Sequence, residues 1–499
     1  MKNYREVAPR VKTIESLRNC ALNNEHAIAD IVDNSFDADA NLVIITLNKK
    51  NYVTIFDNGK GMSLDKMYEA LTLGSDTGHE DGDLGKFGMG LKVSGTSMGR
   101  RLELLSKEIG EEPHKVVYDL DHMQANGKWE AWDEPLSEAE MKDFANIAHG
   151  TYVNITNLDN VKKQIEGCTV NYLRRAFRNF LKDGKMICVN SKQLTPIDPL
   201  ERGEKGTKIY LDKTVKLCGK DVHFTVAEVQ TDKSDISAEK DNDSHLKIGL
   251  QNQGFFVVRN GREIKGPDGL DIYDRHPSAN RFRCEISFSE DADKDFGVPP
   301  TKDNVVLNDG MKLAIIHQVG QYRTAIMNKN KRKTRVEAAK EIDHSDAEHI
   351  IAACKNLDVK RAKKEKRNSP KIRNVTPIQK PVKPVDPNVK RIRRNFRFIQ
   401  PSINSMPAEF QEAALGENGR LFDCYFDKGK IVIRWNYEHP FHEKLIAKYR
   451  KDKNVVTPID LMVYSLSVEL LSAETEEISL AMDNAIDTMS GNLVKLLGE

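Results

Sequence analysis

Residues 24–92 contain three short motifs from which the fold prediction is built: Asp30-Ile31-Val32-Asp33-Asn34, Asp57-Asn58-Gly59-Lys60-Gly61-Met62, and Gly85-Lys86-Phe87-Gly88-Met89-Gly90-Leu91-Lys92. A fourth motif, Gly150-Thr151, follows later. Around the first motif the apolar residues recur with a helical period, which predicts a helix. Asp30 and Asn34 are four residues apart and therefore share one helix face. A carboxylate beside an amide can position a water molecule and supply an oxygen ligand for Mg²⁺. An ordinary polar helix face is the alternative.

The second and third motifs have the composition of a nucleotide site. Asp57 follows the strand-like residues 52–56, where its carboxylate could accept a hydrogen bond from an adenine amino group. Gly59 and Gly61 would let the backbone approach a flat base, although an Asp-Asn-Gly sequence is also common in ordinary turns. The third motif follows neither the Walker nor the Rossmann order. A glycine loop that opens a helix can nevertheless bind phosphate through backbone N–H groups, and Lys92 adds a positive charge.

In this order the motifs resemble the GHKL superfamily of ATPases (gyrase B subunits, ninety-kilodalton heat-shock chaperones, histidine kinases and MutL). Residues 30–40 are similar to the N-box of MutL and of the Microrchidia (MORC) ATPases. The resemblance implies an α/β fold, the GHKL (Bergerat) ATPase sandwich, with ATP and Mg²⁺ as cofactors. It implies that Asn34 binds Mg²⁺, Asp57 binds adenine and Thr151 supports adenine through water. It also implies nucleotide contacts from Gly59, Gly61, Met62, Gly85, Lys86, Phe87, Gly88, Met89, Gly90, Leu91 and Lys92.

Asp30 stands where these ATPases usually carry glutamate as the base that activates water. Aspartate is one methylene shorter, and a misplacement of about 1 Å can lower a rate roughly a hundredfold. The sequence therefore supports ATP binding better than fast hydrolysis.

We expect five segments. Residues 1–215 form the GHKL ATP-binding domain, in which residues 74–85 are either a mobile lid or a polar surface loop. Residues 216–325 form a transducer-like α/β domain, because residues 254–264 resemble the transducer of MORC and MutL proteins. Lys302 lies where those families place a second catalytic residue, a lysine that reaches the γ-phosphate; a solvated loop lysine is the alternative. A helical arm (326–358), a linker (359–395) and a small C-terminal α/β domain (396–499) follow.

The linker carries most of the charge asymmetry. The segment 360–397 has fifteen Lys or Arg and two acids, which is 15 − 2 = +13, whereas the whole chain is +1, so the remainder is 1 − 13 = −12. Its prolines predict an extended, poorly folded segment. Such a segment suits non-specific DNA binding through phosphates; a solubilising linker or nuclear targeting signal is the alternative.

Elsewhere we interpret polar residues as surface residues. Arg174, Arg175 and Arg178, in the helix predicted over 161–181, could touch DNA but are better explained as a solvated face. His439 and His442 lack a third metal ligand and are interpreted as surface residues.

Thr457-Pro458 predicts a helix start. The scattered cysteines predict reduced thiols rather than a zinc module.

Composition bounds the class of protein. A length of 499 residues with 39% hydrophobic residues allows two to four domains with sizeable cores. No run of about eighteen apolar residues predicts a membrane span, and residues 1–6 lack an apolar signal core. We therefore expect no membrane partner and a cytoplasmic location, or a nuclear one in a eukaryote.

Three functions remain open. The first is an ATP-gated clamp in which ATP closes the lid, pairs two chains into a homodimer and traps DNA. The second is an ATP-dependent chaperone or assembly factor with protein partners. The third is a binding module that senses ATP with little turnover. A sensor histidine kinase is disfavoured, because neither a membrane span nor a phosphoacceptor helix is evident.

Overall fold

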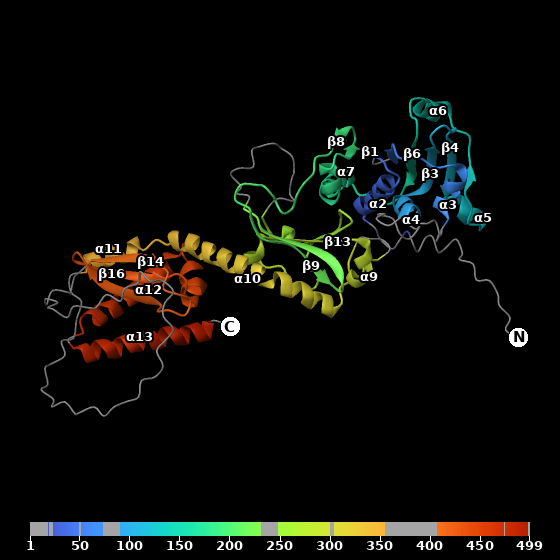
Figure 1. The fold of residues 1–499 in the computed structure, drawn as a ribbon. Helices are drawn as coiled ribbons and strands as arrows, with labels where there is room; N and C mark the ends of the chain where they lie inside the picture. The colour runs from blue at the N-terminus through green and yellow to red at the C-terminus, as the bar shows by residue number, and fades with distance from the viewer. Residues whose placement is uncertain are drawn as a thin grey trace. The chain divides into compact units, whose positions relative to one another are not determined.

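The structure is a computed structural model that describes residue 18 and residues 23–48, 51–72, 90–230, 248–299, 304–354, 407–473 and 475–497. The chain forms two compact units, residues 1–327 and residues 328–499. Figure 1 shows their helices and strands.

The first sheet of unit 1 has eight strands in the order β5-β4-β3-β6-β2-β1-β7-β8. Only the β1–β7 pair is parallel among the pairs described in this sheet. Inward and outward residues alternate along β1 and β2, so one face of these strands enters the core. The strand bounds are Leu42–Asn48 (β1), Tyr52–Asp57 (β2), Gly99–Lys107 (β3), His114–Asp119 (β4), Trp132–Asp133 (β5), Gly150–Leu158 (β6), Met186–Val189 (β7) and Lys192–Gln193 (β8).

The helices of this layer pack their apolar residues against the sheet. Helix α2 is central: it contacts both α4 and α7, and its Ala27, Ile28, Ile31 and Val32 are fully or almost fully buried. The helices are α2 (Asn24–Asp37), α3 (Leu64–Leu71), α4 (Gly90–Met98), α5 (Leu120–Asn126), α6 (Glu138–Ala145), α7 (Ile165–Ala176) and α8 (Arg178–Lys182). This layer is therefore an α/β sandwich, the architecture that the GHKL resemblance implies.

A second sheet follows in the same unit, in the order β12-β11-β13-β10-β9. Asn260 and Gly261 both have positive φ, as a two-residue hairpin turn requires, and they join β11 to β12. Helix α10 (Asp309–Lys340) places Met311, Ile315 and Val319 in the core of this sheet. The strands are β9 (Lys208–Leu217), β10 (Lys220–Glu228), β11 (Gly254–Arg259), β12 (Arg262–Asp268) and β13 (Phe282–Phe288). Short helical turns at Leu250–Asn252 and Pro277–Ala279 lie between strands, and the turn Glu290–Ala292 and helix α9 (Asp293–Phe296) lie between β13 and α10.

The first and second sheets are joined by buried ion pairs that the sequence interpretation missed. Arg175 and Arg178 were expected on a solvated face, but both are buried. Arg175 Nε lies 2.7 Å from Glu263 Oε1, and Arg178 Nη1 lies 2.6 Å from Glu263 Oε2. The reason is a long-range partner: β12 brings Glu263 to α7 and α8. Arg174 is partly exposed and donates to the Thr195 carbonyl oxygen instead.

Unit 2 contains a three-stranded sheet in the order β14-β16-β15. Its strands are β14 (Ala408–Ala413), β15 (Phe422–Asp427) and β16 (Lys430–Asn436), and its helices are α11 (Ser345–Ala353), α12 (Lys453–Leu471) and α13 (Glu476–Leu497), with a π-helical turn at His442–Ala447. Among the described helices, α12 has the length and composition to cross a membrane (mean hydropathy 1.3), and 44% of that segment is buried within the protein. Its Val463, Tyr464 and Val468 pack in the core of unit 2.

In unit 2 the structure differs from the sequence interpretation at two histidines and at the start of α12. His439 and His442 are 0% and 1% exposed, so the surface interpretation is wrong; His439 Nε2 lies 3.1 Å from the Ser490 carbonyl oxygen. Helix α12 begins at Lys453, five residues before the predicted first helical residue Pro458, because Asp452 caps it by accepting from the Asn454 N–H. The division proposed at residue 325 lies inside α10, which continues to Lys340.

Candidate nucleotide site

Asp57 is the last residue of β2 and sits beside Thr151 of β6 in the sheet register. Its side chain is only 5% exposed. Oδ1 accepts a hydrogen bond from the Gly59 N–H at 2.9 Å, and Oδ2 accepts one from the Ser35 hydroxyl at 3.0 Å. Burial raises the pKa of Asp57 to about 6, although these two hydrogen bonds oppose the rise. The result is an oriented buried carboxylate, which is the kind of acceptor that an adenine amino group needs.

Two hydroxyl groups extend this polar cluster. Ser106 Oγ and Thr151 Oγ1 are 2.8 Å apart, and both residues are buried. Ser106 Oγ also accepts from the Met62 N–H at 2.9 Å. The cluster therefore joins the ends of β2, β3 and β6. It brings together Asp57 and Thr151, which the sequence predicted to contact adenine, and Met62, which it predicted to contact the nucleotide.

Gly59 and Gly61 have a structural role that the sequence interpretation did not include. A Cβ on Gly61, whose φ is +70°, would lie 1.9 Å from the Lys107 carbonyl oxygen. A Cβ on Gly59 would lie 2.8 Å from the Ala38 carbonyl oxygen. Both glycines are therefore required by close backbone packing within the protein itself, whatever approach to a base they also allow.

Helix α2 carries the predicted base and the predicted Mg²⁺ ligand. Asp30 is 8% exposed, and Asn34 on the next turn is partly exposed. Ser94 Oγ donates to Asp30 Oδ2 at 3.0 Å, and Arg262 Nη2 donates to Asp30 Oδ1 at 3.3 Å. Within the described residues no group of three or more His, Cys, Asp or Glu could hold a metal ion. A single amide oxygen still fits Mg²⁺, which is commonly held by one or two protein groups together with substrate phosphates and water.

Lys92 lies in α4, two residues after the helix begins at Gly90, and is 3% exposed. Its ammonium donates to the Thr72 carbonyl oxygen at 2.5 Å, just beyond the end of α3. Burial lowers the pKa of Lys92 to about 8. Leu91 is partly buried against the core and Gly90 is exposed. Gly85, Lys86, Phe87, Gly88 and Met89, the segment 74–85 and Lys302 lie outside the described residues.

The sequence interpretation missed Ser35, Ser106, Ser94, Arg262 and His149, whose ring Nδ1 lies 2.6 Å from the Gly59 carbonyl oxygen. Ser35 directly follows Asn34, so its position was available as a signal. Arg262 had no such signal, because its contact with Asp30 spans 232 residues of sequence.

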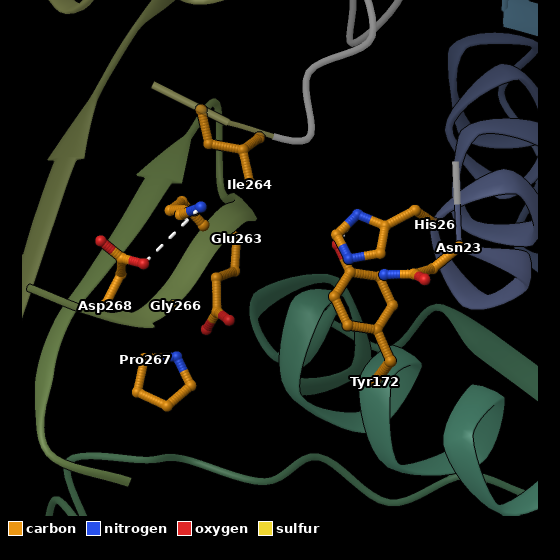
Figure 2. Close-up of a pocket in the computed structure, with 9 residues that line it drawn as sticks. Asn23, His26, Tyr172, Glu263, Ile264, Gly266, Pro267 and Asp268 are labelled. Atoms are coloured by element: carbon orange, nitrogen blue, oxygen red, sulfur yellow. Dashed lines mark hydrogen bonds and ion pairs between the residues drawn. The ribbon is translucent and has the colours of Figure 1, made fainter. Parts of the chain in front are cut away.

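A cavity of about 260 Å³ lies between α2, α7 and β12 and is separate from the Asp57 cluster. Figure 2 shows Asn23, His26 and Tyr172 on one side of it and the residues of β12 on the other. It is lined by Asn23, His26, Tyr172, Glu263, Ile264, Lys265, Gly266, Pro267 and Asp268. None of the predicted nucleotide-binding residues that the structure describes lines this cavity.

Comparison with known proteins gives a match in the same region. Residues 22–151 match the family described as Histidine kinase-, DNA gyrase B-, and HSP90-like ATPase. Residues 22–151 are a GHKL domain. The matched segment begins just before α2 and ends at Thr151, so it contains Asp30, Asn34 and the whole Asp57 cluster.

A region of the chain is also similar to part of a curated protein. The chain is 33% identical over 87 residues to "ATPase morc-1" of Caenorhabditis elegans. That alignment covers 17% of this chain and 10% of the relative, so the chain spans about a tenth of that relative's length. It supports a MORC-type resemblance for the aligned region.

Proposed function

We propose that this protein binds ATP with Mg²⁺ in the GHKL domain, hydrolyses it slowly, and uses the cycle to close a dimeric clamp on DNA. The observation that carries ATP binding is the buried, doubly hydrogen-bonded Asp57 carboxylate at the end of β2 in a domain of this family. Its burial would exclude water from the adenine contact, and its fixed orientation lowers the entropy lost on binding.

The proposed roles follow the site residues. Asp57 accepts from the adenine amino group, with Gly59, Gly61, Met62 and Thr151 around it, and Asn34 holds Mg²⁺. The segment 85–92 binds the phosphates, and Lys302 reaches the γ-phosphate. Asp30 takes the proton from the attacking water. Mg²⁺ bound to the phosphates would offset their negative charge during hydrolysis.

Slow hydrolysis is proposed from the length of the base. Aspartate at residue 30 is one methylene shorter than glutamate and therefore has less reach toward the attacking water. A sensor with little turnover is the closest alternative, and turnover with Mg²⁺ separates the two.

DNA is proposed as the partner because of the segment 360–397, which carries +13 on a chain of net charge +1. Phosphate neutralisation releases counterions, so DNA affinity should fall steeply with salt and depend little on sequence. Two such segments in a closed dimer would act together on one duplex. A cytoplasmic location, or a nuclear one, is compatible with this partner. A chaperone acting on protein partners is the alternative.

The test measures chain mass in solution and duplex affinity, each with and without a non-hydrolysable ATP analogue. One variant neutralises seven basic residues of the segment: Lys363, Lys364, Lys366, Arg367, Arg391, Arg393 and Arg394. A matched control neutralises seven exposed lysines of the folded parts: Lys128, Lys142, Lys163, Lys205, Lys213, Lys428 and Lys451.

The proposal predicts an analogue-dependent dimer and salt-sensitive DNA binding that the first variant loses and the control largely keeps, with ATP binding unchanged in both. Equal DNA affinity in the first variant and the parent would remove DNA from the proposal and favour the chaperone.

A further inference from the structure

The predicted base Asp30 is held from two sides by two different parts of unit 1. Ser94, on the helix that follows the glycine loop, donates to Oδ2 at 3.0 Å. Arg262, the first residue of β12 in the second sheet, donates to Oδ1 at 3.3 Å. Ser94 is 0% exposed and Arg262 is 2% exposed. Both contacts are therefore shielded from water. A charge-assisted hydrogen bond orients its partner most strongly in such a buried environment.

Arg262 is itself fixed in place. Its Nε lies 3.0 Å from Oδ1 of Asp33, which is 1% exposed. Its guanidinium carbon lies 5.7 Å from the ring centre of Phe177, which is within the range of a cation–π contact. A planar guanidinium can bind two carboxylates at once in a defined geometry, which a lysine ammonium cannot reproduce. Arg262 therefore bridges two residues on one face of α2.

Strand β12, which carries Arg262, is bound to helices α7 and α8 through buried ion pairs. Its next residue, Glu263, pairs with Arg175 at 2.7 Å and with Arg178 at 2.6 Å. Breaking a buried pair leaves an uncompensated charge and is strongly destabilising. Strand β12 is therefore held against α7 and α8, and the position of Arg262 relative to α2 is set by these contacts.

We propose that Arg262 is the positioning residue of Asp30, acting together with Ser94, so that the second sheet and α4 jointly set the direction of the base. This inference rests on the proposed function. An aspartate oxygen has two acceptor positions, so each oxygen of Asp30 can still accept from a water molecule while its donor holds it. Aspartate is one methylene shorter than glutamate, so its carboxylate has to be oriented accurately to reach the attacking water. The hydrogen bonds from Arg262 and Ser94 supply that orientation.

Arg262→Lys keeps the positive charge and removes the planar fork. We expect it to lower kcat about tenfold to a hundredfold, the range that a displacement of up to about 1 Å produces. ATP affinity should stay within about twofold of the parent, because Arg262 is not among the predicted nucleotide contacts. Ser94→Ala should lower kcat in the same direction by a smaller factor, and it tests the same inference if Arg262→Lys folds poorly.

A matched control is available in the same sheet. Arg259 is also 2% exposed and pairs with Asp293 through contacts of 2.8 and 3.0 Å. Arg259→Lys makes the same chemical change at a buried ion pair in which the carboxylate belongs to α9 rather than α2. We expect it to affect thermal stability about as much as Arg262→Lys, while kcat stays within about twofold of the parent.

A double-mutant cycle distinguishes positioning from a structural role. The first cycle combines Asp30→Glu, which lengthens the carboxylate side chain, with Arg262→Lys, which shortens its cationic partner. Because the two side chains are in contact, their effects on kcat should deviate from additivity by about fivefold or more. Asp30→Glu combined with Arg259→Lys should be additive within about twofold.

Additivity in both cycles, or a kcat of Arg262→Lys equal to that of the parent, would overturn the inference and leave the proposed function standing. A parent chain that binds ATP without any turnover would instead remove Asp30 as a base and this inference with it. A parent that does not bind ATP would overturn the proposed function itself. The assays are phosphate release for kcat and calorimetry for ATP affinity.

Discussion

Asp57→Asn should weaken ATP binding while stabilising the protein. The substitution keeps the size of the side chain but exchanges one acceptor oxygen for an NH₂ donor. The remaining oxygen can still accept from the Gly59 N–H. The new NH₂ group can donate to the Ser35 hydroxyl, whose single proton can then be directed to the Ile31 carbonyl oxygen 3.1 Å away. We therefore expect the variant to fold with its local hydrogen bonds satisfied.

The two magnitudes have opposite signs. Burial raises the pKa of Asp57 from 3.8 to about 6, which destabilises the charged form by about 3 kcal/mol. That shift already includes the opposing hydrogen bonds from Gly59 and Ser35, so Asp57→Asn should raise the free energy of unfolding by up to about 3 kcal/mol at pH 8. Loss of the charged acceptor should reduce ATP affinity by about 1–3 kcal/mol, roughly 5- to 150-fold in Kd.

The pH dependence gives a second signature. Because the folded-state pKa of Asp57 lies above its unfolded value, this group favours folding at low pH, and its contribution is lost as pH rises from about 4 to about 6. The Asp57→Asn variant should lack that component. Calorimetry measures ATP affinity, and denaturant unfolding at several pH values measures stability.

Asp119→Asn is the matched control, since Asp119 ends β4 of the same sheet and caps α5 by accepting from the Asp121 and His122 N–H groups. Asparagine caps helices as well as aspartate does, so we expect unchanged ATP affinity. Unchanged ATP affinity in Asp57→Asn as well would refute the assignment of the adenine contact.

Three further outcomes are expected. Asp30→Asn should retain ATP affinity and lose phosphate release, and a parent-like rate would show that Asp30 is not the base. Gly61→Ala should lower the thermal midpoint by several degrees and weaken ATP binding, because its Cβ would overlap a backbone carbonyl oxygen at 1.9 Å; a parent-like melting curve would contradict the packing argument. Burial disfavours the charged form of His344, but hydrogen bonds to Asp460 and Glu412 outweigh it and raise its pKa to about 9. This stabilisation of unit 2 is complete below about pH 6.5 and is lost by about pH 9, by up to about 3 kcal/mol; unfolding of His344→Gln with an unchanged pH dependence between 7 and 9 would exclude it.

The periodic parts of the fold could be predicted from the sequence. The helix expected around the first motif is α2, and the strand-like residues 52–56 lie in β2. These segments have one buried face, so burial repeats every 3.6 or 2 residues and is visible in the sequence. The family is confirmed for residues 22–151 because its motifs combine residue type and order. The roles predicted for Asp30, Asn34, Asp57 and Thr151 stay predictions.

What the sequence did not reveal depends on partners distant in the chain. Arg175 and Arg178 have the same local pattern whether they face solvent or Glu263, which is more than 80 residues away. His439 and His442 are buried by contacts with α13 and β14 that no local pattern encodes. The start of α12 was misplaced because Val456, which is 1% exposed, adds a buried turn before Pro458 and outweighs the proline signal.

The central claim is that the GHKL domain binds ATP with Mg²⁺ at Asp57, and calorimetric titration of the full chain with a non-hydrolysable ATP analogue tests it most directly. The titration is run with Mg²⁺, without Mg²⁺, and with the Asp57→Asn variant. We expect one site per chain, weaker binding without Mg²⁺, and a Kd roughly 5- to 150-fold higher in the variant. Absence of saturable binding up to about millimolar analogue, or equal Kd values in parent and variant, would contradict the account.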